Sequence, residues 1–428
     1  MENKSVRRRT FRLCVLMLSL SVVTAAARAD SVLEWNTIAV KTAVDNKQNP
    51  FAQARTVAIV QLAVFEAVNS ITGDYKPYLG ITEPSSASAE AAAVEAAYKA
   101  LSNLFLDPAT QTALLADRTA SLAAIPDDQA KTDGIQAGDD AANAMTNLRA
   151  HDGSSPPLTK VPGPPVPGEW QATPSCLPNA NGIQVGVAFN WQFVTPFGIS
   201  SASDYLLDPP PALTSRAYTK AYNEVMTVGE INSSARPQDR SDVATFFAAT
   251  SPTQAFNQAA RLVAEEMGGS LSENARALAL MNMAISDSIV ASFYNKYHYN
   301  FWRPETAIHA GDTDRNRKTE ADPDWVPFIL TPCFPSYPSN HGSAGNAAAE
   351  VLRRLYGEAA HAITLTNAAV PAITLQYDSF KEITDDISDA RVYGGIHFRT
   401  DQEAGAHLGR AIGAAVYKNN LRRLHHHD

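Results

Sequence analysis

Three short blocks in the last third of the chain constrain the fold most, because their polar side chains make sense together only at one shared site. In chain order the blocks are KYHYNFWRP, PSNH and RVYGGIHFRTD. They carry three cations, two histidines, a hydroxyl and a carboxylate, at Lys296, Arg303, Ser339, His341, Arg391, His397 and Asp401. Charged donors of this kind bind oxyanion oxygens strongly. The blocks therefore predict a site for a tetrahedral oxyanion.

Length and charge limit the partners of the chain. It has 428 residues, of which 45% are hydrophobic, and a formal net charge of −9. The length suggests one large or two ordinary domains. Nucleic acid and anionic membrane surfaces need a basic face to bind, so we expect neither as a partner. The anion site must therefore be local.

The first 29 residues predict an export signal. A basic stretch at 7–12 precedes an apolar run at 13–23, and 27–29 offers a small-x-small cleavage site. The run is too short to span a bilayer, and we expect no later span. The mature protein should then begin near Asp30 and be periplasmic or secreted. Residues 8–11 resemble a twin-arginine signal, and plain secretion stays open as the route.

Cysteine usage leaves a disulfide open. Cys14 lies in the signal, so Cys176 and Cys333 remain. They can pair in an oxidising compartment or serve as two separate small core residues. Two cysteines cannot build a structural zinc site, and the sequence has no HExxH, CxxC or Walker motif.

Hydrophobic periodicity predicts a mainly helical chain. Apolar residues recur at intervals of three and four over 50–71, and 89–101 and 111–124 behave similarly. Residues 153–174 are rich in proline and glycine, which excludes a helix or a central strand. The helical pattern returns from Ala217.

This pattern divides the chain into four parts. We expect a signal at 1–29, an N-terminal helical bundle at 30–150, a connecting segment at 151–215 and a catalytic helical bundle at 216–428. Within the connecting segment, aromatic residues such as Trp170 and Trp191 suit core packing. A short β-hairpin is expected near 183–194.

The first block places a lysine on the buried side of a helix. An apolar stripe from Leu278 through Ile285 and Ile289 continues in register to Lys296. A buried lysine is costly unless it meets an anion. Arg303 lies seven residues further on, so we expect it two turns away on nearly the same face, with Pro304 ending the helix.

The second block predicts a helix N-terminus. Ser339 suits the N-cap position, and the alanine-rich run after it favours a helix. The amides of Asn340 and Gly342 could donate to an anion there, and His341 would lie in the first turn. Alone, the block could equally be an N-cap serine beside an incidental histidine.

The third block pairs a histidine with a carboxylate. His397 and Asp401 are four residues apart, which predicts one face of a helix. The aspartate can accept from one ring nitrogen and leave the other as a lone-pair donor. Arg391 lies across the flexible pair 394–395. Alone, such a pair could also be a surface or capping interaction.

The three motifs K-x6-RP, PSxH and R-x5-H-x3-D, in this order, resemble the signature shared by vanadium-dependent haloperoxidases and type 2 phosphatidic acid phosphatases, including bacterial acid phosphatases. NPFAQARTVAIVQLAVFEAVNSI, VTPF and PPPALTSRAYTKAYNEV are similar to the bacterial haloperoxidase-related branch. The resemblance implies an all-α fold of helical bundles of the haloperoxidase and acid phosphatase type.

The resemblance also implies roles. Vanadate, or phosphate competing for the same site, would be held by Lys296, Arg303, Ser339, Asn340 and Arg391. His397 would be the axial vanadium ligand, or the nucleophile that forms a phosphohistidine, and Asp401 would orient it. His341 would be the general acid–base group.

Two positions depart from the family pattern. Asn340 stands where the family has glycine, and Ala390 where a serine often precedes Arg391. Asparagine keeps its backbone N–H and tolerates left-handed geometry, so the anion hole should survive, with an extra side chain near the pocket. Ala390 removes a hydroxyl and no primary ligand.

The residues in and around the motifs favour the peroxidase over the phosphatase. FWRP, CFPSYPSNH and YGGIHFRTD resemble haloperoxidase segments more than those of short phosphatases, and about 400 mature residues leave room for two bundles. We therefore expect a vanadate-dependent haloperoxidase that takes hydrogen peroxide, a halide and a small organic acceptor. An acid phosphatase and a non-enzymatic periplasmic anion-binding protein are the alternatives. A homo-oligomer is left open.

Overall fold

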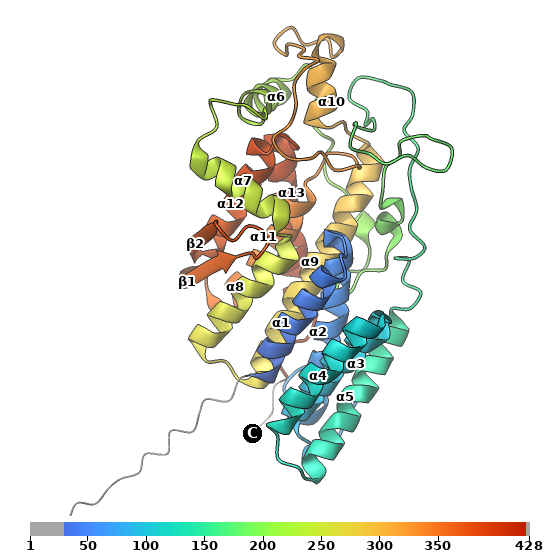
Figure 1. The fold of residues 1–428 in the computed structure, drawn as a ribbon, viewed down its shortest axis with the longest axis vertical. Helices are drawn as coiled ribbons and strands as arrows, with labels where there is room; N and C mark the ends of the chain where they lie inside the picture. The colour runs from blue at the N-terminus through green and yellow to red at the C-terminus, as the bar shows by residue number, and fades with distance from the viewer. Residues whose placement is uncertain (1–29, 425–428) are drawn as a thin grey trace, which may run out of the picture.

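The computed structural model describes residues 30–424, so the expected signal lies outside the described residues. Helices dominate this part of the chain, which confirms the all-α expectation (Figure 1). The first helices are α1 Ser31–Asp45, α2 Pro50–Thr72, α3 Ala89–Leu104, α4 Pro108–Ala123 and α5 Gln129–Leu148. The later ones are α6 Arg216–Val228, α7 Gln238–Ala249, α8 Pro252–Met267, α9 Leu271–Tyr299, α10 Pro304–His309, α11 Asn340–Tyr356, α12 Phe380–Tyr393 and α13 Arg399–Asn419.

The three helices expected in the N-terminal half are confirmed as α2, α3 and α4. Each begins at a side-chain cap, because Asn49, Ser88 and Asp107 accept hydrogen bonds from the first-turn amides of α2, α3 and α4. Pro50 and Pro108 occupy the first helical position, where the missing N–H costs no hydrogen bond. Local sequence alone therefore explains where these helices begin.

Helix α9 is the central element of the molecule, with α2 on one side and α11 and α13 on another (Figure 1). One continuous apolar core includes Ile59 and Phe65 of α2 together with Leu280 and Ile285 of α9. The proposed division into two bundles thus stays a prediction, and residues of both expected bundles share a core.

Three glycines bring α13 close to α11. A Cβ at Gly405, Gly409 or Gly413 would lie 2.7, 2.1 or 2.6 Å from a backbone oxygen of the Ser339–Ala347 stretch. Only a residue without a side chain allows this approach. The spacing of four places the glycines on one helix face. This stripe positions the second motif block against the third.

The expected hairpin near 183–194 is wrong. Isolated bridges pair Lys160 with Gly186 and Pro178 with Gln184 there, and a short 3₁₀ helix, η1, covers Phe189–Phe193. Proline and glycine interrupt strand pairing in this segment. Instead, β1 Ala359–Thr366 pairs antiparallel with β2 Thr374–Ser379 (Figure 1). In β1, buried and exposed residues alternate over most of the strand, as a half-buried strand requires.

The connecting segment 151–215 lies on the core through aromatic and polar anchors. Trp170 and Trp191 are buried, as expected. The buried carboxylate of Asp287 on α9 accepts hydrogen bonds from the amides of Phe197, Gly198 and Ile199 at 2.6, 2.7 and 3.0 Å. Two further 3₁₀ turns, η2 Ala202–Tyr205 and η3 Gly311–Thr313, complete the irregular regions.

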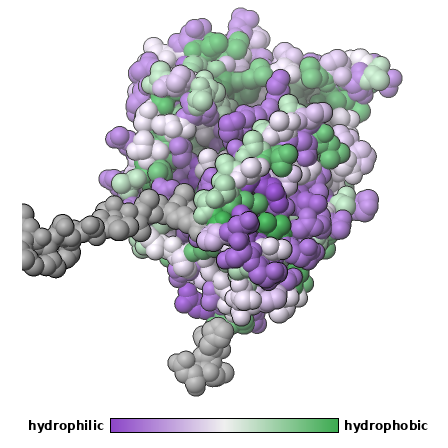
Figure 2. Space-filling model, turned by 60° about the horizontal axis from the view of Figure 1, so that its bottom comes forward, coloured by the Kyte–Doolittle hydropathy of each residue, from purple (hydrophilic) through white to green (hydrophobic). Residues whose placement is uncertain are grey.

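The expectation of no span after residue 29 stays a prediction. By length and composition, α2 and α9 are each long and apolar enough to cross a bilayer. However, 83% and 94% of their apolar windows are buried inside the protein. On the face in Figure 2, hydrophilic areas are interspersed with hydrophobic ones. The apolar character of both helices is explained by core packing.

Candidate active site

The structure brings the three motif blocks together at one end of α9. Lys296 lies in the last turn of α9, and Ser339 caps α11. Arg391 lies in the last turn of α12, before a loop in which Gly395 has a φ of +79°, and His397 and Asp401 follow at the start of α13. The expected turn between Arg391 and His397 is therefore present, and the left-handed residue is a glycine.

Arg303 does not continue the helix of Lys296, contrary to the sequence expectation. Helix α9 ends at Tyr299 because Asn300 adopts a left-handed conformation with a φ of +49°. Arg303 is extended and caps α10, whose first residue is Pro304. Proline at this position begins a helix instead of ending one. The turn still brings Arg303 back toward the site.

The side chains of Lys296 and Arg303 donate hydrogen bonds to the loop that precedes α11. Lys296 Nζ donates to the carbonyls of Pro335 and Ser336 at 2.8 and 2.7 Å. Arg303 Nε donates to the carbonyl of Phe334 at 2.8 Å, and the Phe334 ring centre lies 5.2 Å from Lys296 Nζ and 5.0 Å from Arg303 Cζ. Both cations are fully buried, so this loop fixes their heads rigidly.

His397 is held in one orientation by Asp401 and in one tautomer by Arg303. Nδ1 of His397 lies 2.9 Å from Asp401 Oδ2, and Nε2 lies 3.0 Å from Arg303 Nη1. A guanidinium only donates, so Nε2 must carry the lone pair and Nδ1 the proton. His397 precedes α13 and does not share a helix face with Asp401, which corrects the local prediction. The expected contact forms because Asp401 reaches back across the first turn.

Ser336 is a contact that sequence reasoning missed. Its Oγ donates to Asp401 Oδ2 at 2.6 Å and lies 3.3 Å from His397 Nδ1. The Phe398 amide also donates to Asp401 Oδ2, at 3.2 Å. Ser336 and Ser339 both sit in PSYPSNH, and nothing in that string distinguishes the serine that faces Asp401.

Burial shifts the pKa values of the ionisable groups at the site. It lowers the pKa of Lys296 well below its ordinary value, with a further lowering from Arg303. Burial also lowers the pKa of Arg303 to about 9 and that of Arg391 to about 10. Asp401 is the buried carboxylate beside His397 in this group, and burial raises its pKa to about 6. Three buried cations thus gather around Asp401, which favours binding of a further negative charge.

Unpartnered donors support the same conclusion. Among the described residues, Arg303 Nη2 and Arg391 Nε are buried without a hydrogen-bond partner. Arg391 Nη1 donates to the Phe247 carbonyl at 3.1 Å, which aims its guanidinium. Buried donors without acceptors are costly, and oxyanion oxygens would satisfy them. The residues present therefore fit vanadate or phosphate.

The N-terminus of α11 differs in detail from the expectation. Ser339 Oγ accepts from the Gly342 amide at 3.2 Å, so that amide completes the N-cap instead of facing an anion. The Asn340 side chain accepts from Ser292 Oγ at 2.6 Å and is thereby tied to α9. The backbone N–H of Asn340 is at the first helical position, where a helix supplies no acceptor.

His341 lies half-buried near Arg391 and His397, at one cavity. Burial, Arg391 and Lys296 lower its pKa well below the ordinary value. Burial, Arg303 and Lys296 do the same for His397. Both imidazoles are therefore neutral in this cationic surrounding, and a bound oxyanion would raise both pKa values.

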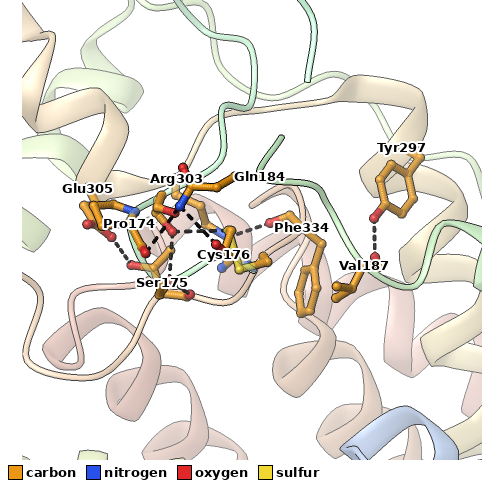
Figure 3. Close-up of a disulfide and its surroundings, with 12 residues drawn as sticks. Pro174, Ser175, Cys176, Gln184, Val187, Tyr297, Arg303, Glu305 and Phe334 are labelled. Atoms are coloured by element: carbon orange, nitrogen blue, oxygen red, sulfur yellow. Dashed lines mark hydrogen bonds between the residues drawn. A yellow bond between two sulfur atoms is a disulfide. The ribbon is translucent and has the colours of Figure 1, made fainter. Parts of the chain in front are cut away.

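A disulfide between Cys176 and Cys333 settles the pairing that the sequence left open. Figure 3 shows it beside Arg303 and Phe334, with Gln184 donating to the Cys176 carbonyl at 3.0 Å. The Val187 amide donates to the Cys333 carbonyl at 2.8 Å. The disulfide thus ties the connecting segment to the loop that carries the carbonyl acceptors of both buried cations.

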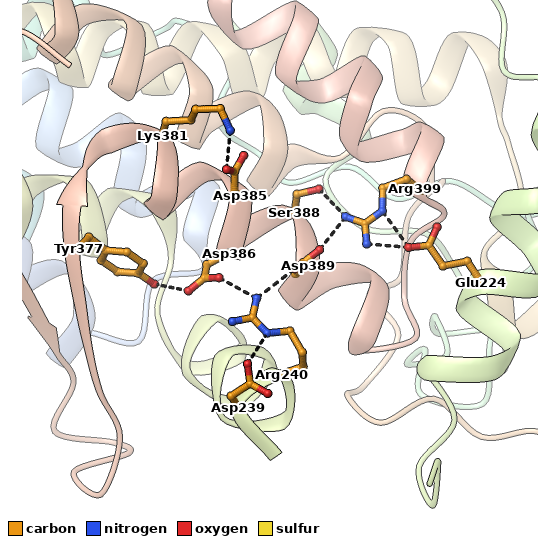
Figure 4. A network of polar contacts seen from close by, with 10 residues as sticks. All are labelled: Glu224, Asp239, Arg240, Tyr377, Lys381, Asp385, Asp386, Ser388, Asp389 and Arg399. Carbon is orange, nitrogen blue, oxygen red and sulfur yellow. Dashed lines mark hydrogen bonds and ion pairs between the residues drawn. The ribbon is translucent and has the colours of Figure 1, made fainter. Parts of the chain in front are cut away.

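A network of ion pairs links α12 to the neighbouring helices. Arg240 of α7 pairs with Asp386 and Asp389 at 2.7 and 3.0 Å, and Arg399 pairs with Asp389 and Glu224 at 2.8 and 2.7 Å (Figure 4). These contacts join α6, α7, α12 and the start of α13. The network therefore fixes the two helix ends that carry Arg391 and Asp401.

A known protein family matches the part of the chain that contains the three motif blocks. Residues 276–426 match the family of VCPO second helical-bundle domains. Vanadium chloroperoxidase from Curvularia inaequalis is 28% identical over 192 residues, which cover 37% of this chain and 30% of that protein. The match thus spans less than a third of that enzyme's length.

Solved structures extend the likeness to the whole fold. A bacterial vanadium-dependent iodoperoxidase aligns with a TM-score of 0.77 and 23% identity, covering 92% of this chain and 97% of that one. An apo-type bacterial vanadium-dependent chloroperoxidase aligns with a TM-score of 0.68 and 16% identity, covering 86% and 92%. The fold is that of the bacterial vanadium haloperoxidases.

Proposed function

We propose that the chain is a vanadate-dependent haloperoxidase, which oxidises a halide with hydrogen peroxide to a hypohalous species. The observation that carries the proposal is the His397 Nε2 lone pair, held by Asp401 and facing buried cations with unpartnered N–H groups. The comparisons support it, because the segment that contains these residues matches a haloperoxidase domain family.

Each residue then has a task. Lys296, Arg303 and Arg391 would hold the oxygens of vanadate, together with the Asn340 amide, and His397 Nε2 would bind the vanadium. Bound vanadate supplies a Lewis-acidic centre for the activation of peroxide. His341 lies at the same cavity and would move a proton to or from the bound oxygens.

The negative charge of the oxyanion would keep this proton transfer within reach of neutral pH. Without that charge, burial and the neighbouring cations hold the pKa of His341 low. The charge offsets both effects and returns the pKa toward the range where histidine exchanges protons readily. The acid–base step therefore depends on anion binding.

The experiment compares two chemistries in one preparation of residues 30–428. Halide-dependent consumption of peroxide is measured with and without added vanadate, and hydrolysis of a chromogenic phosphate ester is measured in parallel. We expect peroxide consumption only with vanadate and halide, and its inhibition by phosphate. Ester hydrolysis without peroxide consumption would replace the proposal with a phosphatase that uses His397 as nucleophile. Vanadate binding without either activity would leave an anion-binding protein.

We also infer export from the cytoplasm. The N-terminal signal pattern supports it, and so does the Cys176–Cys333 disulfide, since disulfides persist mainly in oxidising compartments. Cell fractionation of the full chain tests this: the protein should be found outside the cytoplasm with its first 29 residues removed. A full-length cytoplasmic protein would contradict the inference.

A further inference from the structure

The oxyanion site opens into an apolar cleft larger than the anion needs. The cleft has a volume of about 710 Å³, and His341, Arg391 and His397 lie at it. Volumes of this order accommodate a whole small organic molecule. Tetrahedral oxyanion, peroxide and halide together contain only a few heavy atoms, so most of this space has another use.

Three distant segments build the cleft walls. They are the start of α2 at 49–52, the region of η1 at 187–191 and the loop 329–334 before α11. The disulfide and the Val187–Cys333 hydrogen bond join the last two. The walls are therefore braced against each other, as a pre-formed binding site requires.

Aromatic rings form one wall. Phe51 and Trp191 make an edge contact with centroids 4.7 Å apart, and Phe293 lies behind them, 5.4 Å from Phe51. The same Phe293 ring is 5.3 Å from Phe334. Phe51, Trp191 and Phe334 all line the cleft. This aromatic wall offers ring faces and edges to a flat partner.

Charge at the cleft selects among apolar partners. The cleft lining, all of it within residues 30–424, includes Arg391 but no aspartate or glutamate. The buried Lys296 and Arg303 stand just beyond His397. A cationic molecule would meet repulsion here, whereas a neutral or anionic one would not.

Leu330 completes the rim. Its side chain is 78% exposed, yet it borders the cleft. An exposed leucine alone is ordinary, but at the edge of an aromatic-lined cleft it can cover an apolar ligand. Leu106, between α3 and α4, is 80% exposed and does not line the cleft, so it provides a matched control.

We propose that this cleft binds the organic acceptor, a small electron-rich aromatic molecule that is neutral or anionic, such as a phenol. The inference rests on the proposed function. The hypohalous acid formed beside His397 would meet the acceptor before escaping to bulk water. A carbon–halogen bond forms at the ring, and the halogen–oxygen bond breaks with its electron pair on oxygen. The ring proton joins that hydroxide as water, so carbon is oxidised and the halogen is reduced.

The first test measures binding without turnover. Calorimetry of 2-naphthol with residues 30–428 should show one site, and Leu330→Ser should weaken it by about tenfold, as loss of a buried leucine contact implies. Leu106→Ser should leave the affinity unchanged. 2-Naphthylmethylammonium, the cationic analogue, should bind more weakly. Absence of binding, or equal binding of both probes, would overturn the proposal.

The second test measures where the halogen goes. During turnover with equal 2-naphthol and taurine, the enzyme should direct more halogen to naphthol than hypohalous acid added directly does. Leu330→Ser should shift this ratio toward that of the free reagent, and Leu106→Ser should not. A wild-type ratio equal to that of the free reagent would overturn the proposal. If no peroxide is consumed with vanadate while naphthol still binds, the proposed function fails and the cleft assignment stands.

Discussion

Ser336→Ala is the perturbation whose effect follows most directly from the structure. The Ser336 hydroxyl donates at 2.6 Å to Asp401 Oδ2, the same oxygen that faces His397 Nδ1. Burial raises the pKa of Asp401 to about 6, and the Ser336 hydrogen bond opposes that rise. A hydrogen bond to a charged group contributes about 1.5–3 kcal/mol. Its loss should therefore raise the Asp401 pKa by about one to two units.

The sign of the pH effect follows from proton linkage. Because the folded pKa of Asp401 lies above its ordinary value of 3.8, its stabilising contribution is full at low pH and is lost as pH rises through about 6. Ser336→Ala extends that loss to higher pH. The variant should thus lose about 1.5–3 kcal/mol of unfolding free energy at pH 8, but only about 1 kcal/mol at pH 5, where the carboxyl is protonated.

Two assays check this reasoning. Urea unfolding at pH 5 and pH 8 measures the free-energy differences, and the pH dependence of halide oxidation should show its acid limb displaced upward by the same one to two units estimated above from the lost hydrogen bond. Ser288→Ala is the control, because this buried α9 serine donates to the Ile285 carbonyl at 2.8 Å and not to a carboxylate. An acid limb that does not move, or equal destabilisation at both pH values, would refute the role of Ser336 in setting the charge of Asp401.

The remaining predictions concern the anion, the helix contact and the disulfide. His397→Ala should abolish both vanadate binding and peroxide consumption, whereas His341→Ala should keep most binding and lose the rate; equilibrium dialysis and initial rates separate the two, and undiminished halide oxidation by the His341 variant from pH 5 to 8 would remove its acid–base role. Gly409→Ala should destabilise the fold by about 3 kcal/mol, because the added Cβ would lie 2.1 Å from an α11 carbonyl, while Gly163→Ala, which meets nothing closer than 3.9 Å, should change urea unfolding little. Cys333→Ser should lower unfolding stability by about 2–5 kcal/mol and weaken vanadate binding, and a variant with unaltered vanadate affinity would show that the loop holds the cations without the disulfide.

The sequence by itself determined the helical class, and it predicted the residues that we propose for the oxyanion site. Periodicity at three and four located α2, α3 and α4, and each of them begins at a capping side chain. The motif spacing brought His397 to Asp401 and predicted a buried Lys296 in need of an anion. These features depend on neighbours within a few residues, which is the range that sequence patterns report.

Local geometry at the motif ends required the structure. Arg303 is two turns from Lys296 in sequence, but the left-handed Asn300 separates them into different elements. His397 precedes α13 instead of lying on it. The sheet lies at 359–379 and not near 183–194, because the register of two strands depends on which residues face each other across the pair. Cap and turn conformations are decided by small energy differences that tertiary contacts override.

Long-range contacts were decided only by the tertiary structure. Ser336 reaches Asp401 across 65 residues, and Cys176 meets Cys333 across 157. The cleft combines segments near residues 50, 190 and 330. No local sequence pattern predicts these long-range contacts. They follow from how the glycine stripe of α13 and the core around α9 pack. The sequence thus supplied the chemical groups of the site, and packing supplied their partners and the shape of the space beside them.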